Sequence, residues 1–383
     1  MDKPLEGLLV LDFSQFLAGP SAALRMADLG ATVIKIERPG VGELARQLYI
    51  SDLELDGDST LFHTINRNKQ SYGADLKNPE DMVRVKKLIA RADVMIQNFR
   101  PGVIERLGLG YETARALNPG IVYGTVSGYG KAGPWSHLAG QDLLAQSRSG
   151  LTWLSGNADQ GPIAFGLSIA DLAAGAHLVQ GILACLVRRG IRKVGGLVEV
   201  SLMESVLDLQ FELLTTYLND GGKLPARGTR NSANAYLGAP YGIYETQDGY
   251  LALAMGSLAK LAEALEYPAL NAFGEREQLF TQRDEIKRLI AEHLKQRPTD
   301  FWTAKLEAVD YWCAPVWDWN DLLNSDGFQA LEFVQEVQRD NGARLRTTRC
   351  PISIDGERYY CGRGAPKPGE HTIGIDESFG LNA

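Results

Sequence analysis

Apolar residues in the first 200 positions gather in short runs separated by longer amphipathic segments. Leu8–Ser14 is an almost continuous apolar run and Ala31–Glu37 is a second, and each predicts a buried strand. Between them, Pro20–Gly30 predicts a helix, because proline suits a first helical turn and glycine commonly follows a last one. Two further strands are expected at Asp93–Phe99 and Ile121–Gly130.

The segment before the third strand carries a helix-start signal. Asn78 can cap the helix, Pro79 suits its first position, and acidic residues follow in the first turn. Strands that alternate with helices of this length form right-handed βαβ units around a parallel sheet. The pattern therefore predicts an α/β fold with a doubly wound, mainly parallel, Rossmann-like sheet.

The pattern changes near Met203, where one long helix is expected to run to the glycine pair Gly221–Gly222. Beyond it, Asp248–Gly249 predicts a hairpin turn. Three helices are expected at Leu258–Glu266, Arg283–Lys295 and Asp300–Ala308, the last capped by Thr299, and the strand-like tail Phe333–Gly356 is expected to return to the large domain. The expected organisation is a large α/β domain at 1–203 and 330–383, a linker helix at 204–222, and a smaller α+β domain with linker at 223–329.

Composition and charge exclude several classes of protein. Of the 383 residues, 45% are hydrophobic and 22% charged, which is typical of a globular chain. The net charge of -8 argues against a nucleic-acid partner, whose phosphates require a basic surface. Four separated cysteines without a CxxC motif and five scattered histidines predict neither a disulfide framework nor a zinc site. We expect a cytoplasmic protein without a membrane segment, since no uncharged apolar run reaches about 18 residues.

Common nucleotide and hydrolase motifs are missing. A nicotinamide enzyme should follow its first strand with GxGxxG, but the turn here reads FLAGPSA. No Walker A sequence and no GxSxG elbow occur. The acidic stretch Asp52–Asp58 lacks the ligand spacing of a calcium loop. We therefore expect no metal and no NAD.

Six segments in order carry a resemblance to a known family. They read DFSQFLAGP, ATVIKIERPGVGE, NRNKQSYGADLK, ADVMIQNFRPGVIERLGL, SGYGKAGP and GNADQGP. Together they resemble the class III (CaiB/BaiF) CoA-transferases, which include formyl-CoA:oxalate and carnitine CoA-transferases and have α-methylacyl-CoA racemases as relatives. The resemblance implies a large domain built from both chain ends, a small middle domain, and a homodimer of two subunits threaded as interlocked rings.

The resemblance also implies the chemistry. The family's catalytic carboxylate falls on Asp159, in SGNADQGP. A carboxylate is ionised at neutral pH, so it can attack an acyl-CoA thioester without a general base. The implied intermediates are a mixed anhydride and an aspartyl-CoA thioester, and the implied substrates are an acyl-CoA donor and a carboxylic-acid acceptor.

The implied CoA contacts follow predicted strands, where open α/β sheets bind ligands. Arg38 and Arg106 are expected to meet phosphates, and Phe99 the adenine region. The full set carried over is Leu17, Ala18, Arg38, Ala74, Asp75, Leu76, Lys77, Asn98, Phe99, Arg100, Arg106, Gly128, Tyr129, Gly130 and Lys131. Gln15 and Leu17 replace the histidine and glutamine of formyl-CoA transferase, so the identity of the acceptor acid does not carry over.

Two alternatives stay open. A racemase needs an acid and a base, and Gln141 stands where the racemases have the histidine of AGHD, although Asp171 matches their aspartate. Since an amide cannot exchange a proton near neutral pH, Gln141 favours a transferase. The second alternative is a CoA-binding protein without turnover, in which Asp159 is only a loop residue.

Overall fold

The computed structural model describes residues 3–382, which form two compact units. Unit 1 comprises Met1–Ala145, Ser168–Leu209 and Glu332–Ala383, and unit 2 comprises Gln146–Leu167 and Gln210–Leu331. The segment Gln146–Leu167, which the sequence pattern assigns to the large domain, thus packs with unit 2.

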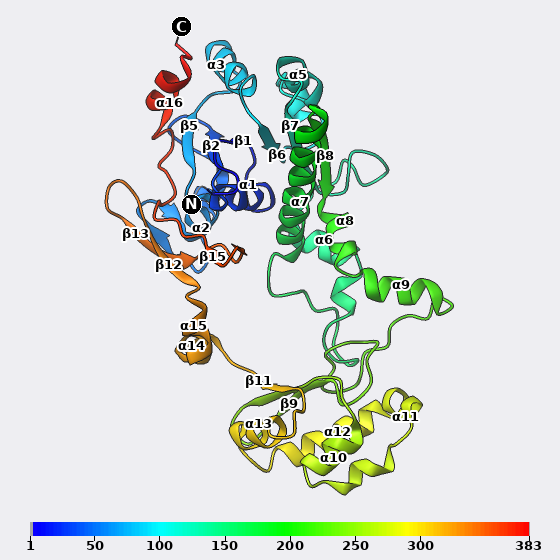
Figure 1. The fold of residues 1–383 in the computed structure, drawn as a ribbon. Coiled ribbons are helices and arrows are strands. Elements are labelled where there is room, and N and C mark those ends of the chain that lie inside the picture. The colour runs from blue at the N-terminus through cyan, green and yellow to red at the C-terminus, as the bar shows by residue number, and fades with distance from the viewer. Residues whose placement is uncertain (1–2, 383) are drawn as a thin grey trace. The chain divides into compact units, whose positions relative to one another are not determined.

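Unit 1 is built on a six-stranded parallel sheet (Figure 1). Its order is β5 (Gln70–Gly73), β2 (Thr32–Glu37), β1 (Leu9–Asp12), β6 (Val94–Gln97), β7 (Val122–Ser127) and β8 (Gly196–Ser201). Numbered along the chain, this is the 3-2-1-4-5-6 order of doubly wound nucleotide-binding folds. The order reverses between β1 and β6, and the loops after these two strands flank the crevice where such folds bind ligands. The predicted parallel α/β sheet is confirmed.

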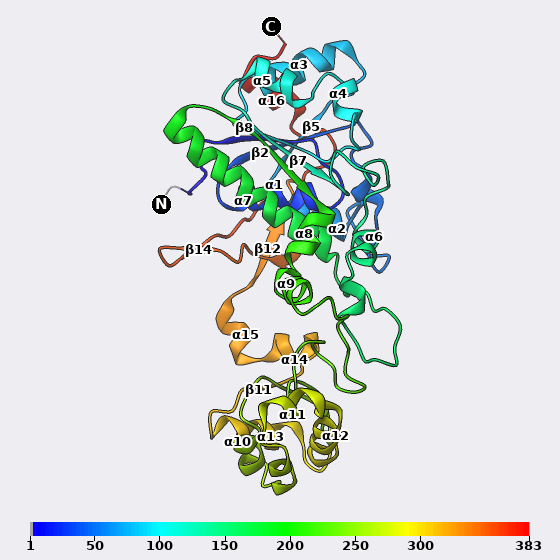
Figure 2. The ribbon, with the colours of Figure 1, turned by 90° about the vertical axis from the view of Figure 1, so that its right-hand side faces the viewer.

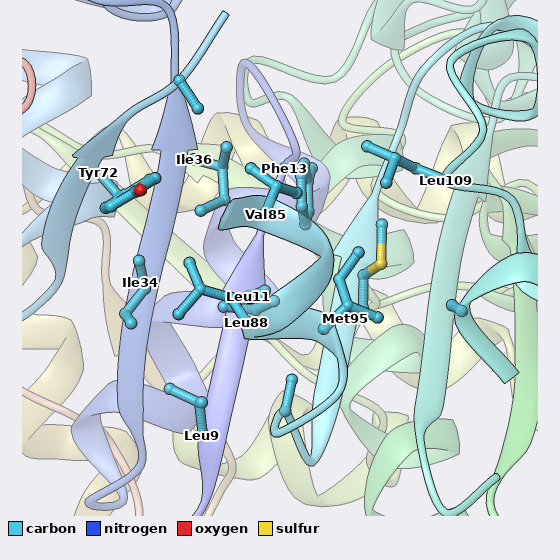
Figure 3. Packing of buried hydrophobic residues seen from close by; sticks show 14 of the residues in the cluster. Leu9, Leu11, Phe13, Ile34, Ile36, Tyr72, Val85, Leu88, Met95 and Leu109 are labelled. Carbon is cyan, nitrogen blue, oxygen red and sulfur yellow. The ribbon is translucent and has the colours of Figure 1, made fainter. Parts of the chain in front are cut away.

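Helices cover both faces of this sheet. The helices of unit 1 are α1 (Ala18–Asp28), α2 (Thr60–Asn66), α3 (Pro79–Ile89), α4 (Val103–Arg106), α5 (Tyr111–Leu117), α6 (Asp142–Arg148, which ends in unit 2), α7 (Ile169–Arg192), α8 (Leu202–Asp208) and α16 (Thr372–Phe379). On one face, Leu11 and Met95 of the sheet pack under Val85 and Leu88 of α3 (Figure 3). The start of α3 at Pro79, capped by the Asn78 side chain, confirms the sequence signal.

The other face is covered by α1 and α7, which pack on each other (Figure 2). By length and hydropathy α7 is apolar enough to cross a membrane. Its contacts with α1, β7 and β8 are those of a core helix, and Leu178 and Ile182 are fully buried. A side chain at Gly175 would overlap Ser21 and the carbonyl of Ala18, so glycine permits the close crossing of α7 over the first turn of α1.

The predicted long helix after Met203 is wrong, because the segment forms two helices. α8 ends at Asp208 and α9 spans Phe211–Asn219, and the break lies where the chain passes from unit 1 to unit 2. No proline or glycine marks this break in the sequence. The α8 half packs on α7, whereas α9 contains no buried residue, so tertiary contacts end the first helix.

Unit 2 holds a three-stranded antiparallel sheet of β11 (Cys313–Pro315), β10 (Tyr250–Leu253) and β9 (Gly242–Glu245), and the predicted hairpin is confirmed. Its further helices are α10 (Leu258–Ala264), α11 (Arg276–Thr281), α12 (Arg283–Leu294), α13 (Thr299–Glu307), α14 (Trp319–Asn324) and α15 (Asp326–Leu331). The prediction that Thr299 caps α13 is wrong. Thr299 is its first residue, and its N–H donates to the Asp248 carboxylate at 2.8 Å.

Short strands form three further antiparallel pairs in the described part of the chain. They are β3 (Glu54–Leu55) with β4 (Asp58–Ser59), β12 (Val334–Gln338) with β13 (Arg344–Thr348), and β14 (Ser353–Ile354) with β15 (Glu357–Arg358), each pair antiparallel, and 3-10 turns span Leu44–Gln47, Leu151–Trp153 and Pro268–Ala272.

A group of buried charges lies at the carboxyl end of β1. Lys69 Nζ is 2.8 Å from Asp12 Oδ2, and Lys35 Nζ is 3.3 Å from Glu43 Oε1. All four side chains are almost completely buried. Burial lowers the pKa of Lys69 to about 8. Burial acts to raise the pKa of Asp12, but the charges of Lys35 and Lys69 hold it below its usual value. We call Asp12, Lys35, Glu43 and Lys69 the β1 ion network.

Removal of one charged side chain from the β1 ion network should destabilise the protein, because it leaves the other buried charges without a partner. We expect Asp12→Ala to lower the free energy of unfolding by about 3 to 5 kcal/mol, because two buried ammonium groups lose a carboxylate. Urea denaturation followed by circular dichroism measures the loss. The control is Arg288→Ala, which removes an exposed ion pair on α12 and should change the midpoint little. Equal, small losses for the two variants would contradict the prediction.

Candidate active site

Side chains at the end of β6 bond to both neighbouring strands' segments at the crevice between β1 and β6. The Gln15 N–H donates to Asn98 Oδ1 at 2.8 Å, and Asn98 Nδ2 donates to the Gln15 carbonyl at 2.7 Å. The Gln97 side chain accepts from the Phe99 N–H and donates to Thr125 of β7. The loop after β1 is therefore bonded to the loop after β6, and the end of β6 is bonded to β7.

A cavity of about 180 Å³ opens beside this crevice in unit 1. The sequence-predicted residues in its wall are Gln15, Arg38, Ala74, Asp75, Leu76, Lys77 and Phe99. They come from the four loops that follow β1, β2, β5 and β6. Two of the seven residues, Arg38 and Lys77, are exposed cations. A cavity smaller than the usual 300 to 1,000 Å³ holds only part of a ligand as large as CoA. Cations beside an aromatic ring nevertheless suit its phosphates and adenine.

Other predicted CoA contacts lie near this edge without lining the cavity. Leu17 and Ala18 start α1, whereas Arg100 and Arg106 are exposed after β6. The set Gly128, Tyr129, Gly130 and Lys131 follows β7, with Lys131 Nζ 2.5 Å from Glu199. A side chain on Gly128 would overlap the α-carbon of Gly140, so the loop that carries the exposed Gln141 lies against the end of β7.

Asp159 lies on an exposed turn of unit 2. The turn is held in shape by Arg227, which donates to the carbonyls of Ser155 and Gly161 at 2.8 and 3.0 Å. The Ala158 N–H donates to the Gly228 carbonyl. The loop with the family-implied carboxylate is thus well fixed, but the Asp159 side chain is exposed, and the cavity lined by Arg38 and Lys77 belongs to the other unit.

A second carboxylate, Asp171, lies in unit 1 in the first turn of α7. Asp142 Oδ1 accepts the N–H groups of Ala170 and Asp171 at 2.7 and 3.3 Å, which caps α7 and brings two carboxylates together. Burial, with a smaller effect from the Asp142 charge, raises the pKa of Asp171 to about 7. Among carboxyl groups, a value so near neutrality is typical of functional sites.

The position of Asp171 follows from the helix crossing. Asp171 and Gly175 are four residues apart, so they lie on the same face of α7. This face meets the first turn of α1 at Ala18. Asp171 therefore lies on the face of α7 that meets the start of α1.

By resemblance, Asp171 in SIAD matches the racemase aspartate, and the transferases also have an aspartate at this position, but the motif places the catalytic carboxylate on Asp159. A sequence signal for Asp171 does exist. It is an ionisable residue in the first turn of a 24-residue, largely apolar helix, where partial burial of the carboxylate is expected. Residues 3–382 contain no group of three or more His, Cys, Asp or Glu placed to hold a metal ion.

Comparison with known proteins identifies the family of the chain. The family model described as CoA-transferase family III matches residues 5–372. Succinate–glutarate CoA-transferase of Agrobacterium fabrum is 31% identical, with 97% of this chain and 94% of that protein covered. Acetyl-CoA:oxalate CoA-transferase of Acetobacter aceti is also 31% identical, with coverage of 98% and 96%.

Solved structures show the same architecture. A CAIB/BAIF family protein from Brucella suis has a TM-score of 0.85 at 28% identity, and 99% of this chain and all of that chain are covered. The protein Rv3272 from Mycobacterium tuberculosis has a TM-score of 0.84 at 28% identity, with coverage of 97% and 99%. The match over nearly the whole chain shows that this chain belongs to CoA-transferase family III and is a class III CoA-transferase.

Proposed function

We propose that the chain moves CoA from an acyl-CoA thioester to a free carboxylic acid through covalent intermediates on Asp171. The observation that supports Asp171 over the sequence-predicted Asp159 is its position. It is half-buried in the unit that carries the CoA cavity, with a pKa raised to about 7. Asp159 is exposed on unit 2 and is kept as the alternative nucleophile.

The first half-reaction needs no general base. A carboxylate oxygen of Asp171 attacks the thioester carbonyl, the C–S bond breaks, and the CoA thiolate leaves with the electron pair. The thiolate then attacks the aspartyl carbonyl of the mixed anhydride, which releases the donor acid as its carboxylate. The enzyme now carries CoA as an aspartyl thioester.

The second half-reaction reverses these steps with the acceptor acid. The acceptor carboxylate attacks the aspartyl thioester and displaces the thiolate, and the thiolate attacks the acyl carbonyl of the new anhydride. The new acyl-CoA leaves, and Asp171 is regenerated as a carboxylate. Retention of the thiolate makes each return step intramolecular, an advantage of up to roughly 7 to 11 kcal/mol in ideal cases. Cations such as Arg38 and Lys77 would hold the far end of CoA meanwhile.

The named relatives suggest a first set of substrates. They act on succinyl-CoA with glutarate and on acetyl-CoA with oxalate, so we propose short dicarboxylic acids as acceptors. Racemisation is less favoured, because Gln141 offers no titrating group opposite Asp171. Assembly as an interlocked homodimer and a cytoplasmic location stay predictions.

Paired amide substitutions decide which aspartate is the nucleophile. We expect Asp171→Asn to abolish CoA transfer and Asp159→Asn to keep most of it, because only the buried carboxylate is replaced in the first variant. Incubation with succinyl-CoA and hydroxylamine, followed by peptide mass spectrometry, should locate the modified residue. Modification at Asp159, or inactivity of only the Asp159 variant, would restore the nucleophile implied by the family motif.

The raised pKa of Asp171 predicts a pH dependence. The attacking form is the carboxylate, and a group with a pKa of about 7 becomes protonated as the pH falls through 7. We expect kcat/KM to fall below this pH and to level off above it. Asp142→Asn removes the neighbouring charge while keeping a capping oxygen, so the acidic limb should move to lower pH. If the pH profile of kcat/KM is the same in Asp142→Asn as in the wild type, the ionisation that limits activity at low pH is not that of Asp171.

CoA binding should depend on the cavity cations. Arg38→Ala removes a charged group in the cavity wall, and we expect CoA affinity to fall by roughly ten- to a hundredfold, the equivalent of about 1.5 to 3 kcal/mol. Isothermal titration calorimetry measures the change. Arg115→Ala, an exposed arginine on α5, is the matched control and should bind CoA as the wild type does. Equal affinities for the two variants would remove Arg38 from the CoA site.

A further inference from the structure

The turn between β1 and α1 contains a strained residue that the proposed chemistry does not use. Phe16 has a φ of 63°, in the left-handed region that a bulky side chain rarely adopts. Its ring is 44% exposed, so core packing does not account for the conformation. Strained residues of this kind persist where the surroundings impose them, often at functional sites.

Glu43 imposes this conformation. The Phe16 N–H donates to Glu43 Oε2 at 3.0 Å, and Glu43 is 5% exposed. Its other oxygen, Oε1, is 3.3 Å from Lys35 Nζ, and its own N–H donates to Glu37 Oε2 at 3.0 Å. Contacts within the β1 ion network therefore fix the Glu43 carboxylate independently of its hydrogen bond to Phe16.

The turn is held from both sides of the crevice. On the β6 side, the reciprocal hydrogen bonds between Gln15 and Asn98 fix its first residue. On the β2 side, Glu43 fixes Phe16, the next residue. Leu17 and Ala18 come next in the chain, and Gly175 of α7, four residues after Asp171, packs closely on Ala18.

We propose that Glu43 is a positioning residue for CoA transfer, which holds Phe16 left-handed so that the Gln15–Ala18 turn fits the reacting thioester beside Asp171. Glu43 also lies in the wall of the CoA cavity, on the same loop as Arg38. The inference rests on the proposed transfer reaction. In this proposal, Glu43 sets the geometry of the turn, whereas Arg38 contributes to the binding of CoA.

The kinetic test compares two substitutions at one position. Glu43→Ala removes the acceptor of the Phe16 N–H, and kcat per folded protein should fall by about ten- to a hundredfold, with KM for acyl-CoA changed less than about threefold. Glu43→Gln keeps an acceptor oxygen and should retain kcat within about threefold. Unchanged kcat in Glu43→Ala, or equal losses in both variants, would overturn the inference. The wild type must transfer CoA in the same assay, and its inactivity would instead contradict the proposed function.

A thermal test does not depend on turnover. Because glycine accepts a positive φ, Phe16→Gly should make the turn less dependent on Glu43, and the double variant should lose less in Tm than the two single losses predict. Phe16→Gly alone should largely keep kcat, because glycine adopts the left-handed conformation and its N–H can still donate to Glu43. Ser51→Gly, at an exposed position with a φ of 56° outside the site, is the control and should keep wild-type kcat. Additive Tm changes for Phe16→Gly and Glu43→Ala, or a large loss of kcat in Phe16→Gly alone, would overturn the inference.

Discussion

The geometry of the candidate site depends on the buried charges around Asp12 and Lys35. Burial of four ionised side chains is costly, and such pairs often contribute little net stability. Here, however, each charge also holds a backbone group. Lys35 donates to the Ser14 carbonyl, Lys69 donates to the Pro20 carbonyl, and Glu43 accepts from Phe16. The network therefore defines the path of the chain from β1 into α1, where a doubly wound fold binds its ligand.

Two carboxylates of unit 1 show how pairing decides their chemistry. Asp12 has two ammonium groups nearby, so its pKa lies below the usual value although it is completely buried. Asp171 has no such compensation, since burial and the charge of Asp142 both raise its pKa. The first is suited to hold structure as a permanent anion. The Asp171 carboxylate is an anion that its surroundings stabilise poorly. Attack on a carbonyl removes this negative charge, which makes such a carboxylate the better nucleophile.

The sequence predicts those parts of the fold that local pattern determines. Apolar runs located β1 and β2, Asn78 and Pro79 located the start of α3, and motif order located most of the cavity wall. It could not predict the break at Gln210, which no local residue marks, nor the pairing of Asp12 with a lysine 57 positions away. Lys35 and Lys69 stand in segments of mixed polarity, and only the folded chain shows that their partners are carboxylates.

Local sequence likewise does not determine which aspartate is the proposed nucleophile. A motif identifies a loop, and the loop of Asp159 is well fixed by Arg227, but a fixed loop does not determine the reactivity of an exposed carboxylate. Water stabilises such an anion and weakens its attack. A group held near a pKa of 7 is desolvated enough to be a better nucleophile and still about half ionised at neutral pH. The proposed nucleophile Asp171 meets both requirements because it is half-buried at the start of α7, on the helix face that meets α1, beside the charge of Asp142.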